Sequence, residues 1–367
     1  MRVLVLGSID SKWVKDYIEY VLLPLGHQVE VIGNAGNCKF QEFYRSHGVL
    51  IHQAQSAGRF TRRIPFVRIL SSATRTAKQN QWNEYDVIVN MFVNHKDLRI
   101  TQKLKSKQTK TVVYYTGSDL LRKSKFHILL NRLLLRHPDA YVMGSETLEK
   151  SFCQRYPEGM PFTTIHFGIS SFENIRAYRK SHPQQKDGPV FCIGYNGSPA
   201  HHHLAVLELF ERLTEEQKKS VELVLPMTYG ASSDYLLQVR SKLDQIGIRY
   251  RLLTEFLDND GMAGLWCSIH YFINAQTTDS LSASVLEAQY AGAVLLNAQW
   301  LDYPEYRTYG IRCASFSNYE ELYQLILDIV NGKQYDETFS ATEKLERVLS
   351  WNTAREAWQT LFLRWSE

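Results

Sequence analysis

Short apolar segments alternate with segments of helical length along nearly the whole sequence, and this alternation limits the folds open to the chain. In the first half the apolar segments lie at residues 1–7, 28–32, 49–52, 86–91, 111–115, 140–143 and 162–166. The segments at 12–25 and 69–82 have helical length, and in the first of them apolar residues recur at helical spacing. Such a pattern predicts a parallel sheet covered by helices on both faces.

The alternation stops after residue 170 and then begins again. Residues 171–188 include the polar stretch RKSHPQQKDGP, with proline and glycine, so we expect a linker there. Strands are expected at 190–195, 221–225, 250–253, 270–274 and 294–297, and helices at 199–213, 235–246, 261–267, 282–291 and 320–331. We therefore expect an α/β protein of two doubly wound, Rossmann-like domains facing a cleft, residues 1–170 and 189–340. A final helix within 341–367 is expected to pack back on the first domain.

Length and charge support two units. A chain of 367 residues is too long for one ordinary core. The net charge of +4 is unevenly divided, because residues 1–168 hold 24 Lys and Arg against 13 Asp and Glu, whereas residues 169–367 hold 18 against 25. The halves therefore carry +11 and −7, which predicts that the first half faces something anionic.

The sequence also indicates a compartment. It contains no run of about 18 apolar residues, so no transmembrane helix is expected. The first residues, MRVLVLGSID, turn polar too early for a signal peptide and predict a strand. The five cysteines show no zinc or redox spacing, so we expect reduced thiols in the cytoplasm.

Residues 277–287, TTDSLSASVLE, form the most informative segment. A strand, a small polar loop and a helix start would present backbone N–H groups to an anion. Glu287 would lie where a carboxylate can accept two ribose hydroxyls, and Asp279 where it can hold sugar hydroxyls. Three hydroxyl donors lie between them, Ser280, Ser282 and Ser284. The other interpretation is an ordinary capped helix with an acid facing solvent, and the residues alone favour neither.

This segment resembles the signature of GT-B glycosyltransferases, notably glycosyltransferase family 4, where two acids eight residues apart bracket a helix start. The matching residues are Asp279, Glu287, Ala288, Ala291, Gly292 and Val294. The resemblance implies a nucleotide-sugar donor site in the second domain. Glu287 would bind the ribose, the helix start at 280–284, including Leu281, would bind the diphosphate, and Asp279 would orient the sugar. The family usually has Glu at the first position, so Asp279 is shorter by one methylene group.

Weaker motifs follow in the order found in that family. They are Gly117-Ser118-Asp119, Asp139-Ala140-Tyr141 with Ser145, Phe167-Gly168-Ile169, and IGYNGS at 193–198. The family commonly carries an Arg and a Lys that neutralise the diphosphate, and this chain lacks them at the matching place. Its segments at 196–203 and 226–230 instead resemble the lipid-linked fucosaminyl transferases of glycosyltransferase family 56. That resemblance implies donor contacts from Asn196, Gly197, Ser198, His203, Thr228 and Tyr229.

Without the Arg and Lys, helix N-termini, histidines or a cation from elsewhere would have to meet the diphosphate charge. The alternative is an inactive site. His201, His202 and His203 invite a metal hypothesis, but consecutive helical residues point about 100° apart. A phosphate contact, a surface helix start and a metal ligand remain open for them. No divalent metal or other cofactor is expected.

In the first domain, candidate residues follow the strand ends. Ser8 and Lys12 lie at the first strand–helix turn, where they would contact phosphate or acceptor, although Lys12 would equally suit a solvated surface. His95 and Asp119 follow later strands and are candidate bases near an acceptor hydroxyl, with an ordinary loop residue as the alternative.

Residues 120–136, LLRKSKFHILLNRLLLR, mix basic and apolar side chains, and residues 59–68 hold Arg59, Arg62, Arg63 and Arg68. Basic amphipathic helices bind anionic membrane surfaces, so we expect peripheral contact with a membrane there. A core helix with a solvated basic face is the alternative. Nucleic acid is not expected, because no recognition module is present.

Taken together, these features predict a hexosyl-type glycosyltransferase. Its donor would be a UDP-, GDP- or dTDP-sugar and its acceptor a hydroxyl of a lipid-linked or oligosaccharide substrate in bacterial cell-surface polysaccharide synthesis. Family 4 implies retention of anomeric configuration, whereas family 56 implies inversion, which would need a base such as Asp119 or His95. Two alternatives stay open: a non-catalytic GT-B partner subunit of an active transferase, and a GT-B sugar-nucleotide epimerase or hydrolase.

Overall fold

The computed structural model describes residues 1–33, 38–56, 65–79, 82–182, 188–309, 313–335 and 346–365. The chain forms two compact units, one of Met1–Gly168 with Arg347–Glu367 and one of Ile169–Glu346. We call them unit 1 and unit 2 and describe each by itself. In the described ranges, no helix is both long and apolar enough to cross a bilayer.

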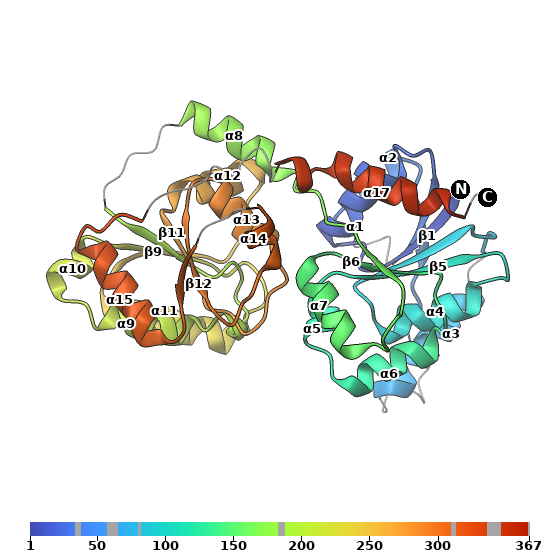
Figure 1. The fold of residues 1–367 in the computed structure, drawn as a ribbon, viewed down its shortest axis with the longest axis horizontal. Coiled ribbons are helices and arrows are strands. Elements are labelled where there is room, and N and C mark those ends of the chain that lie inside the picture. The colour runs from blue at the N-terminus through green and yellow to red at the C-terminus, as the bar shows by residue number, and fades with distance from the viewer. Residues whose placement is uncertain are drawn as a thin grey trace. The chain divides into compact units, whose positions relative to one another are not determined.

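Unit 1 is built on a parallel sheet with seven strands among its described residues, in the order β3-β2-β1-β4-β5-β6-β7 (Figure 1). The strands are β1 Arg2–Leu6, β2 Gln28–Gly33, β3 Leu50–Gln53, β4 Val87–Met91, β5 Lys110–Tyr115, β6 Ala140–Met143 and β7 Phe162–Thr164. Its helices are α1 Lys12–Tyr17, η1 Ile18–Leu22, α2 Gln41–Ser46, α3 Pro65–Gln79, α4 His95–Leu104, α5 Ser118–Leu121, α6 Lys125–Leu134, α7 Glu146–Arg155 and α17 Trp351–Leu363.

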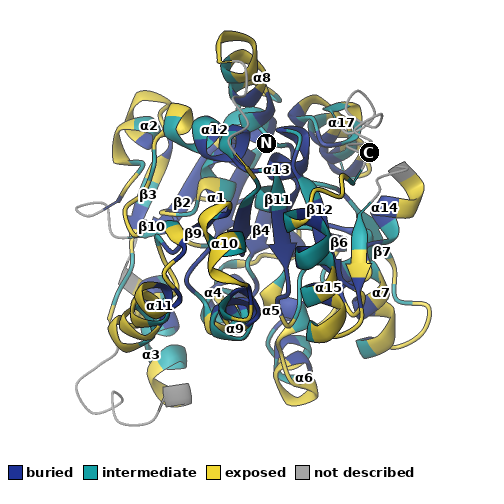
Figure 2. Ribbon diagram, turned by 90° about the vertical axis from the view of Figure 1, so that its left-hand side faces the viewer, coloured by how far each residue is buried: buried dark blue, intermediate teal, exposed yellow. Residues whose placement is uncertain are grey.

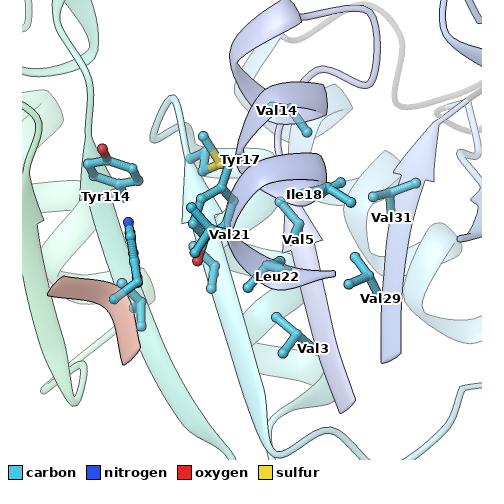
Figure 3. Packing of buried hydrophobic residues seen from close by; sticks show 14 of the residues in the cluster. Val3, Val5, Val14, Tyr17, Ile18, Val21, Leu22, Val29, Val31 and Tyr114 are labelled. Carbon is cyan, nitrogen blue, oxygen red and sulfur yellow. The ribbon is translucent and has the colours of Figure 1, made fainter. Parts of the chain in front are cut away.

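Successive residues of a strand point to opposite faces, and β1 shows how unit 1 uses both. Val3 and Val5 pack with residues of α1, η1 and α17 in one cluster (Figure 3). Leu4 and Leu6 pack in another cluster with residues of α3 and α4. Both faces are therefore apolar, which is why the strands are almost continuously hydrophobic and why a parallel sheet could be predicted.

The C-terminal helix α17 completes the first of these clusters. The ring of Trp358, 1% exposed, lies 4.9 Å from the Tyr17 ring and 5.3 Å from the Tyr114 ring, centre to centre. At the start of the helix, Trp351 packs closely on Gly168. A Cβ atom on residue 168 would lie 2.3 Å from the Trp351 ring. The last helix is thus part of the core of unit 1.

Unit 2 repeats the plan with six parallel strands in its described part, in the order β10-β9-β8-β11-β12-β13. The strands are β8 Val190–Ile193, β9 Glu222–Pro226, β10 Arg249–Leu253, β11 Tyr271–Asn274, β12 Val294–Ala298 and β13 Ala314–Phe316. Its helices are α8 Ser171–Ser181, η4 Pro199–His201, α9 His203–Glu211, α10 Glu215–Lys219, α11 Ser233–Ile246, α12 Asn259–Ser268, α13 Ala283–Tyr290, α14 Pro304–Tyr309 and α15 Tyr319–Val330. Figure 2 shows β9, β11 and β12 largely buried and the outer sides of helices such as α10 and α11 exposed.

Several expected elements differ from the structure. Helix α8 occupies most of the expected linker, because Phe172 and Ile175 are buried at helical spacing within a polar stretch. The helix expected over 12–25 is α1 followed by the π-helical η1. The helix expected over 199–213 is interrupted at His202, whose φ is +56°. Residues 341–345 of the expected last helix and 183–187 of the expected linker lie outside the described residues.

Each sheet has a point where strand order reverses, between β1 and β4 in unit 1 and between β8 and β11 in unit 2. Open α/β sheets bind ligands beyond the carboxyl ends of the strands at such points. Three of the non-glycine residues with positive φ, Phe92, His202 and Leu281, lie in segments that follow β4, β8 and β11. Strained backbone of this kind is concentrated at functional sites.

Replacing Trp358 with alanine should destabilise unit 1 by about 3–5 kcal/mol, because the change removes a buried aromatic side chain and leaves a cavity. The matched control is Leu363→Ala on the same helix, where the side chain is 57% exposed and a loss below about 0.5 kcal/mol is expected. Calorimetric unfolding of the full chain measures both. Equal losses in the two variants would contradict the role of α17 in the core.

Candidate functional site

Asp279 lies in the loop between β11 and α13 and accepts hydrogen bonds from two tyrosine hydroxyls and from backbone N–H groups. Its Oδ2 accepts a hydrogen bond from the Tyr303 hydroxyl at 2.6 Å and one from the Ser282 N–H at 3.2 Å. Its Oδ1 accepts from the Tyr195 hydroxyl at 3.3 Å. Burial raises the pKa of Asp279, and these hydrogen bonds oppose the rise. The carboxylate is therefore fixed in orientation at the end of β11.

Glu287 lies on α13 and is 9% exposed. Its Oε2 accepts a hydrogen bond from the Trp266 Nε1 at 3.0 Å, and its Oε1 accepts one from the Ser171 hydroxyl. A carboxylate has about four lone-pair positions. Two donors from the protein therefore orient Glu287 and leave acceptor positions for the hydroxyls of a ligand.

The segment between the two acids forms the start of α13. Ser282 is the N-cap, and its hydroxyl accepts from the Val285 N–H. Leu281, just before the cap, has a φ of +63°, a costly conformation for a side chain of its size. Ser280 and Ser284 flank these two residues and are half-buried. The loop is thus a strained turn that delivers the N-terminus of a helix to the carboxyl edge of the sheet.

The loop after β8 is locked to the loop after β9. The Gly197 N–H donates to the Tyr229 carbonyl at 2.7 Å, and a Cβ atom on Gly197 would lie 2.6 Å from the Cβ of Ala231. The Asn196 Oδ1 accepts from the Ser198 N–H at 2.8 Å, and the Ser198 hydroxyl caps η4. Glycine is therefore needed at 197 for the two loops to approach this closely.

Two exposed aromatic rings stand at the same edge. Tyr229, after β9, and Phe256, after β10, are 52% and 66% exposed, with parallel rings 6.1 Å apart. Thr228 beside them is half-buried. Burial raises the pKa of the Tyr229 hydroxyl, a hydrogen bond with Asn196 opposes the rise, and the charge of Glu287 adds to it.

Further contacts join the loops after β8 and β11. The Thr277 N–H donates to the Ala200 carbonyl at 2.8 Å. His202 lies between the Tyr319 hydroxyl, 2.7 Å from its Nδ1, and the Thr277 hydroxyl, 3.2 Å from its Nε2. The structure thus brings most of the expected donor residues together at one edge of the unit 2 sheet.

The expected phosphate contact of His203 does not fit its environment. The side chain is 0% exposed, and its Nδ1 lies 3.2 Å from the Tyr235 hydroxyl. Its Nε2 is buried without a hydrogen-bond partner, and burial lowers its pKa to about 4. A buried neutral imidazole neither contacts a nucleotide sugar nor neutralises the charge of its diphosphate. Among the described residues, no group of His, Cys, Asp and Glu is arranged to hold a metal ion.

Cationic side chains are missing from the loops at this edge. The segments after β8, β9, β10, β11 and β12, residues 194–203, 227–232, 254–258, 275–282 and 299–303, contain no Lys or Arg. An anion there would be bound by backbone N–H groups and by hydroxyl groups.

In unit 1, Asp119 serves as a clamp between two strand ends. Its carboxylate accepts from the N–H groups of Val93 at 2.9 Å, Thr116 at 3.1 Å and Gly117 at 2.7 Å, and the residue is 6% exposed. Val93 follows β4 and the other two follow β5. These backbone contacts account for the acid at this position, and its expected role as a base stays a prediction.

The other expected residues of unit 1 lie near strand ends. His95 begins α4, and its ring stacks on the His127 ring at 5.4 Å. Burial lowers the pKa of His95, so the ring is neutral near neutral pH. Ser8 and Lys12 are exposed at the turn between β1 and α1. Nothing in their contacts fixes a role for them.

Helix α6 exposes a stripe of large apolar side chains. Phe126, Leu129 and Leu133 are 65%, 49% and 48% exposed, whereas Ile128 and Asn131 on the other side are buried. Exposed basic residues accompany the stripe, namely Arg122, Lys123, Lys125 and Arg136. Of the second expected basic patch, Arg68 is exposed on α3, and Arg59, Arg62 and Arg63 lie outside the described residues.

No family model matches the sequence, and no curated protein matches it. Solved structures match it in fold. The HepE protein of Anabaena, solved with UDP and glucose, matches with a TM-score of 0.70 and 14% identity, covering 99% of this chain and 100% of that one. A glycosyltransferase of Rickettsia africae gives 0.72 and 14%, covering 100% and 98%. Sucrose-phosphate synthase of Thermosynechococcus elongatus gives 0.70 and 11%, covering 99% and 98%.

The chain has the GT-B fold. Identities this low carry the fold alone, so the predicted fold class is confirmed, whereas family 4 and family 56 remain resemblances. The expected donor residues of unit 2 lie on the helix starts and strand ends of the second GT-B domain.

Four residues of the site were not predicted: Ser171, Tyr195, Trp266 and Tyr303. Tyr195 lies within the IGYNGS motif, where a hydroxyl next to a strand end was a usable signal. The other three contact the acids from α8, α12 and the start of α14. No spacing in the sequence links these elements to residues 279 and 287, so only the fold could identify them.

Stability should depend on pH through His203. Its pKa is about 4 in the folded chain against an ordinary 6.5, so the unfolded chain takes up a proton first as pH falls. Stability is therefore lost as pH falls below the ordinary value, by about 2 kcal/mol between about pH 7 and about pH 5. Chemical denaturation at both pH values measures the loss in the free energy of unfolding. We expect this loss to be about 2 kcal/mol smaller in His203→Gln than in the wild type. The exposed His182→Gln serves as control, and a pH dependence unchanged by His203→Gln would contradict the assignment.

Proposed function

We propose that the chain is a glycosyltransferase that moves a hexose-type sugar from a nucleoside diphosphate to a hydroxyl group. The acceptor would be a lipid-linked or oligosaccharide substrate of the kind used to build cell-surface glycans. Unit 2 would bind the donor, with Glu287 on the ribose, the start of α13 on the diphosphate and Asp279 on the sugar. Ser8 and Lys12 of unit 1 are candidates for phosphate or acceptor contact.

One observation carries the proposal: two oriented carboxylates, Asp279 and Glu287, flank a helix N-terminus at the strand reversal of unit 2. Acids suit polyhydroxylated ligands, and a helix start suits the phosphates between the two sugars. The exposed ring of Tyr229 stands at the same edge of the sheet and supplies a surface on which a base can stack.

Retention of anomeric configuration is the favoured outcome. In transfer, the bond between the anomeric carbon and the phosphate oxygen breaks, and a bond to the acceptor oxygen forms. Inversion needs a protein base, and the carboxylate of Asp119 is occupied by backbone N–H groups. With retention, the departing phosphate oxygen takes the acceptor proton, so no protein base is required. If the reaction inverted configuration, His95, whose ring is neutral at neutral pH, would be the remaining candidate base.

The second candidate function is a non-catalytic partner subunit. The absence of Lys and Arg from the strand-end loops at 194–203, 227–232 and 275–282 favours it, because a leaving diphosphate is normally stabilised by positive charge. Such a protein would bind a nucleotide sugar without turnover.

The donor site is tested with Glu287→Gln, which keeps the size of the side chain and removes its charge. A thermal-shift screen of UDP, GDP and dTDP and their glucose esters should reveal a ligand that stabilises the wild type by roughly 2.7 kcal/mol at 100 times its Kd. The shift should disappear in Glu287→Gln and persist in Glu255→Gln, an exposed acid in the loop after β10.

An assay of sugar transfer with the ligand that the screen identifies separates the candidates. Transfer to a glycan or lipid acceptor by the wild type supports the transferase. Binding without transfer supports the partner subunit. If no nucleotide shifts the wild type, or if both variants behave alike, the proposed donor site is wrong.

We propose further that α6 binds an anionic membrane surface. The exposed stripe of Phe126, Leu129 and Leu133 would enter the lipid interface, and the basic residues around it would meet the headgroups. Charge complementarity favours this occupant, since residues 1–168 carry a net +11.

The variant Phe126→Ser with Leu129→Ser should bind vesicles of phosphatidylcholine with about one-third phosphatidylglycerol at least about tenfold more weakly, because the inserted apolar area is lost. Co-sedimentation measures this. The control is Leu237→Ser on α11 of unit 2, also 65% exposed, which should not change binding. Wild-type protein that ignores the anionic vesicles would refute the proposal.

A further inference from the structure

The hydroxyl group that lies closest to Asp279 belongs to a residue no motif identified. Tyr303 is 3% exposed and donates to the Asp279 Oδ2 at 2.6 Å, a shorter bond than those from Tyr195 or from the Ser282 N–H. It stands at the end of the loop after β12, just before α14 begins. An otherwise apolar ring thus carries one polar atom to the proposed sugar-binding acid.

Behind Tyr303 runs a chain of buried amides that fixes the direction of its proton. The Asn297 Nδ2 donates to the carbonyl groups of Ala298 at 3.0 Å and Leu301 at 2.9 Å. Carbonyl oxygens only accept, so the amide of Asn297 has one possible orientation, with its Oδ1 facing Asn274. Asn274 must therefore present its Nδ2, which donates to the Asn297 Oδ1 at 3.1 Å and to the Tyr303 hydroxyl at 2.9 Å.

The Tyr303 oxygen consequently accepts from Asn274, and its proton points to Asp279. Asn274 and Asn297 are 0% and 4% exposed, so water does not compete with this order of donors. A hydrogen bond from a committed donor to a carboxylate is stronger than a neutral one and fixes the side-chain rotamer. Asp has one methylene group fewer than Glu, so its carboxylate can reach a ligand in fewer ways. The orientation of the Asp279 carboxylate therefore matters more than that of a longer acid.

We infer that Tyr303 is a positioning residue that aims the Asp279 carboxylate at the donor sugar, with Asn274 and Asn297 fixing the direction of its hydroxyl proton. The inference rests on the proposed function and specifies which part of the donor depends on the network. The sugar should be affected and the nucleotide should not, because Glu287 is held separately by Trp266 and Ser171.

The neighbouring tyrosine provides a matched control. Tyr306 is 6% exposed, its ring centre lies 4.9 Å from that of Tyr303, and its hydroxyl donates to the Gln289 Oε1 at 2.6 Å. Tyr306→Phe removes a buried hydrogen bond as short as the one from Tyr303 to Asp279. Among its described contacts, Tyr306 makes no hydrogen bond to Asp279. A purely structural role would make Tyr303→Phe and Tyr306→Phe behave alike.

The test compares Tyr303→Phe, Tyr306→Phe, Asp279→Asn and the double variant Tyr303→Phe with Asp279→Asn in the full chain. Calorimetry gives Kd for UDP, GDP and dTDP and for their glucose esters. Tyr303→Phe should leave the nucleoside diphosphate within about twofold of wild type and weaken the sugar ester about tenfold, whereas Tyr306→Phe should leave both within about twofold. The double variant should be no weaker than Asp279→Asn, because Tyr303 acts through that acid.

Equal weakening of diphosphate and sugar ester by Tyr303→Phe would overturn the inference, as would equal effects in the two tyrosine variants or additive effects in the double variant. A wild type that binds the diphosphate but gains nothing from the sugar would also overturn it. A wild type that binds neither ligand would refute the proposed function itself, and the role of Tyr303 with it.

Discussion

The reversal of strand order beside β8 is the constraint on which the candidate site depends. Because β9 and β11 flank β8 on opposite sides, the loops that follow these three strands converge at one edge of the sheet. Gly197 then allows the loops after β8 and β9 to touch, and Thr277 ties the loop after β11 to Ala200. Asp279, Tyr229 and the start of α13 lie at one edge for this topological reason, although Tyr229 precedes Ala283, the first residue of α13, by 54 residues.

Electrostatics at this edge differ from what phosphate binding usually employs. With no Lys or Arg in the strand-end loops, the available positive potential comes from helix N-termini and from N–H groups near Ser198, Ser232 and Ser282, which cap η4, α11 and α13. His203 adds none, because burial keeps it neutral. Partial charges of this kind are fixed by the fold and do not require a flexible side chain to be ordered on binding. Their total is smaller, and this is why a partner subunit remains the competing function.

The sequence was sufficient to predict the two sheets, and insufficient to predict the contacts that support the candidate site. Continuous apolar strands and alternating helices predicted two parallel sheets, because both faces of each strand are buried. The acids at 279 and 287 are candidates from one strand–helix unit, and the resemblance to family 4, rather than their spacing, favoured them over an ordinary capped helix. The sequence did not predict helix α8, because the composition of this segment is polar. The helix forms because it buries Phe172 and Ile175. The left-handed turn at His202 was missed because local propensity favours an unbroken helix, and it directs His203 into the core.

Two aspartates at strand ends, Asp119 buried and Asp279 half-buried, differ in the donors that they receive. Asp119 receives only backbone N–H groups, which are fixed in position and occupy both of its oxygens, so the acid stabilises the two loops that supply them. Asp279 receives backbone N–H groups of Ser280 and Ser282 as well as two tyrosine hydroxyls, and its contact from Tyr195 is long at 3.3 Å. The long contact from the Tyr195 hydroxyl can yield to a ligand without unfolding a turn, whereas backbone donors cannot, and the short bond from Tyr303 keeps the carboxylate in place. The chemical type of the donors therefore separates an acid that only closes a turn from one whose proposed role is to accept the hydroxyls of a sugar.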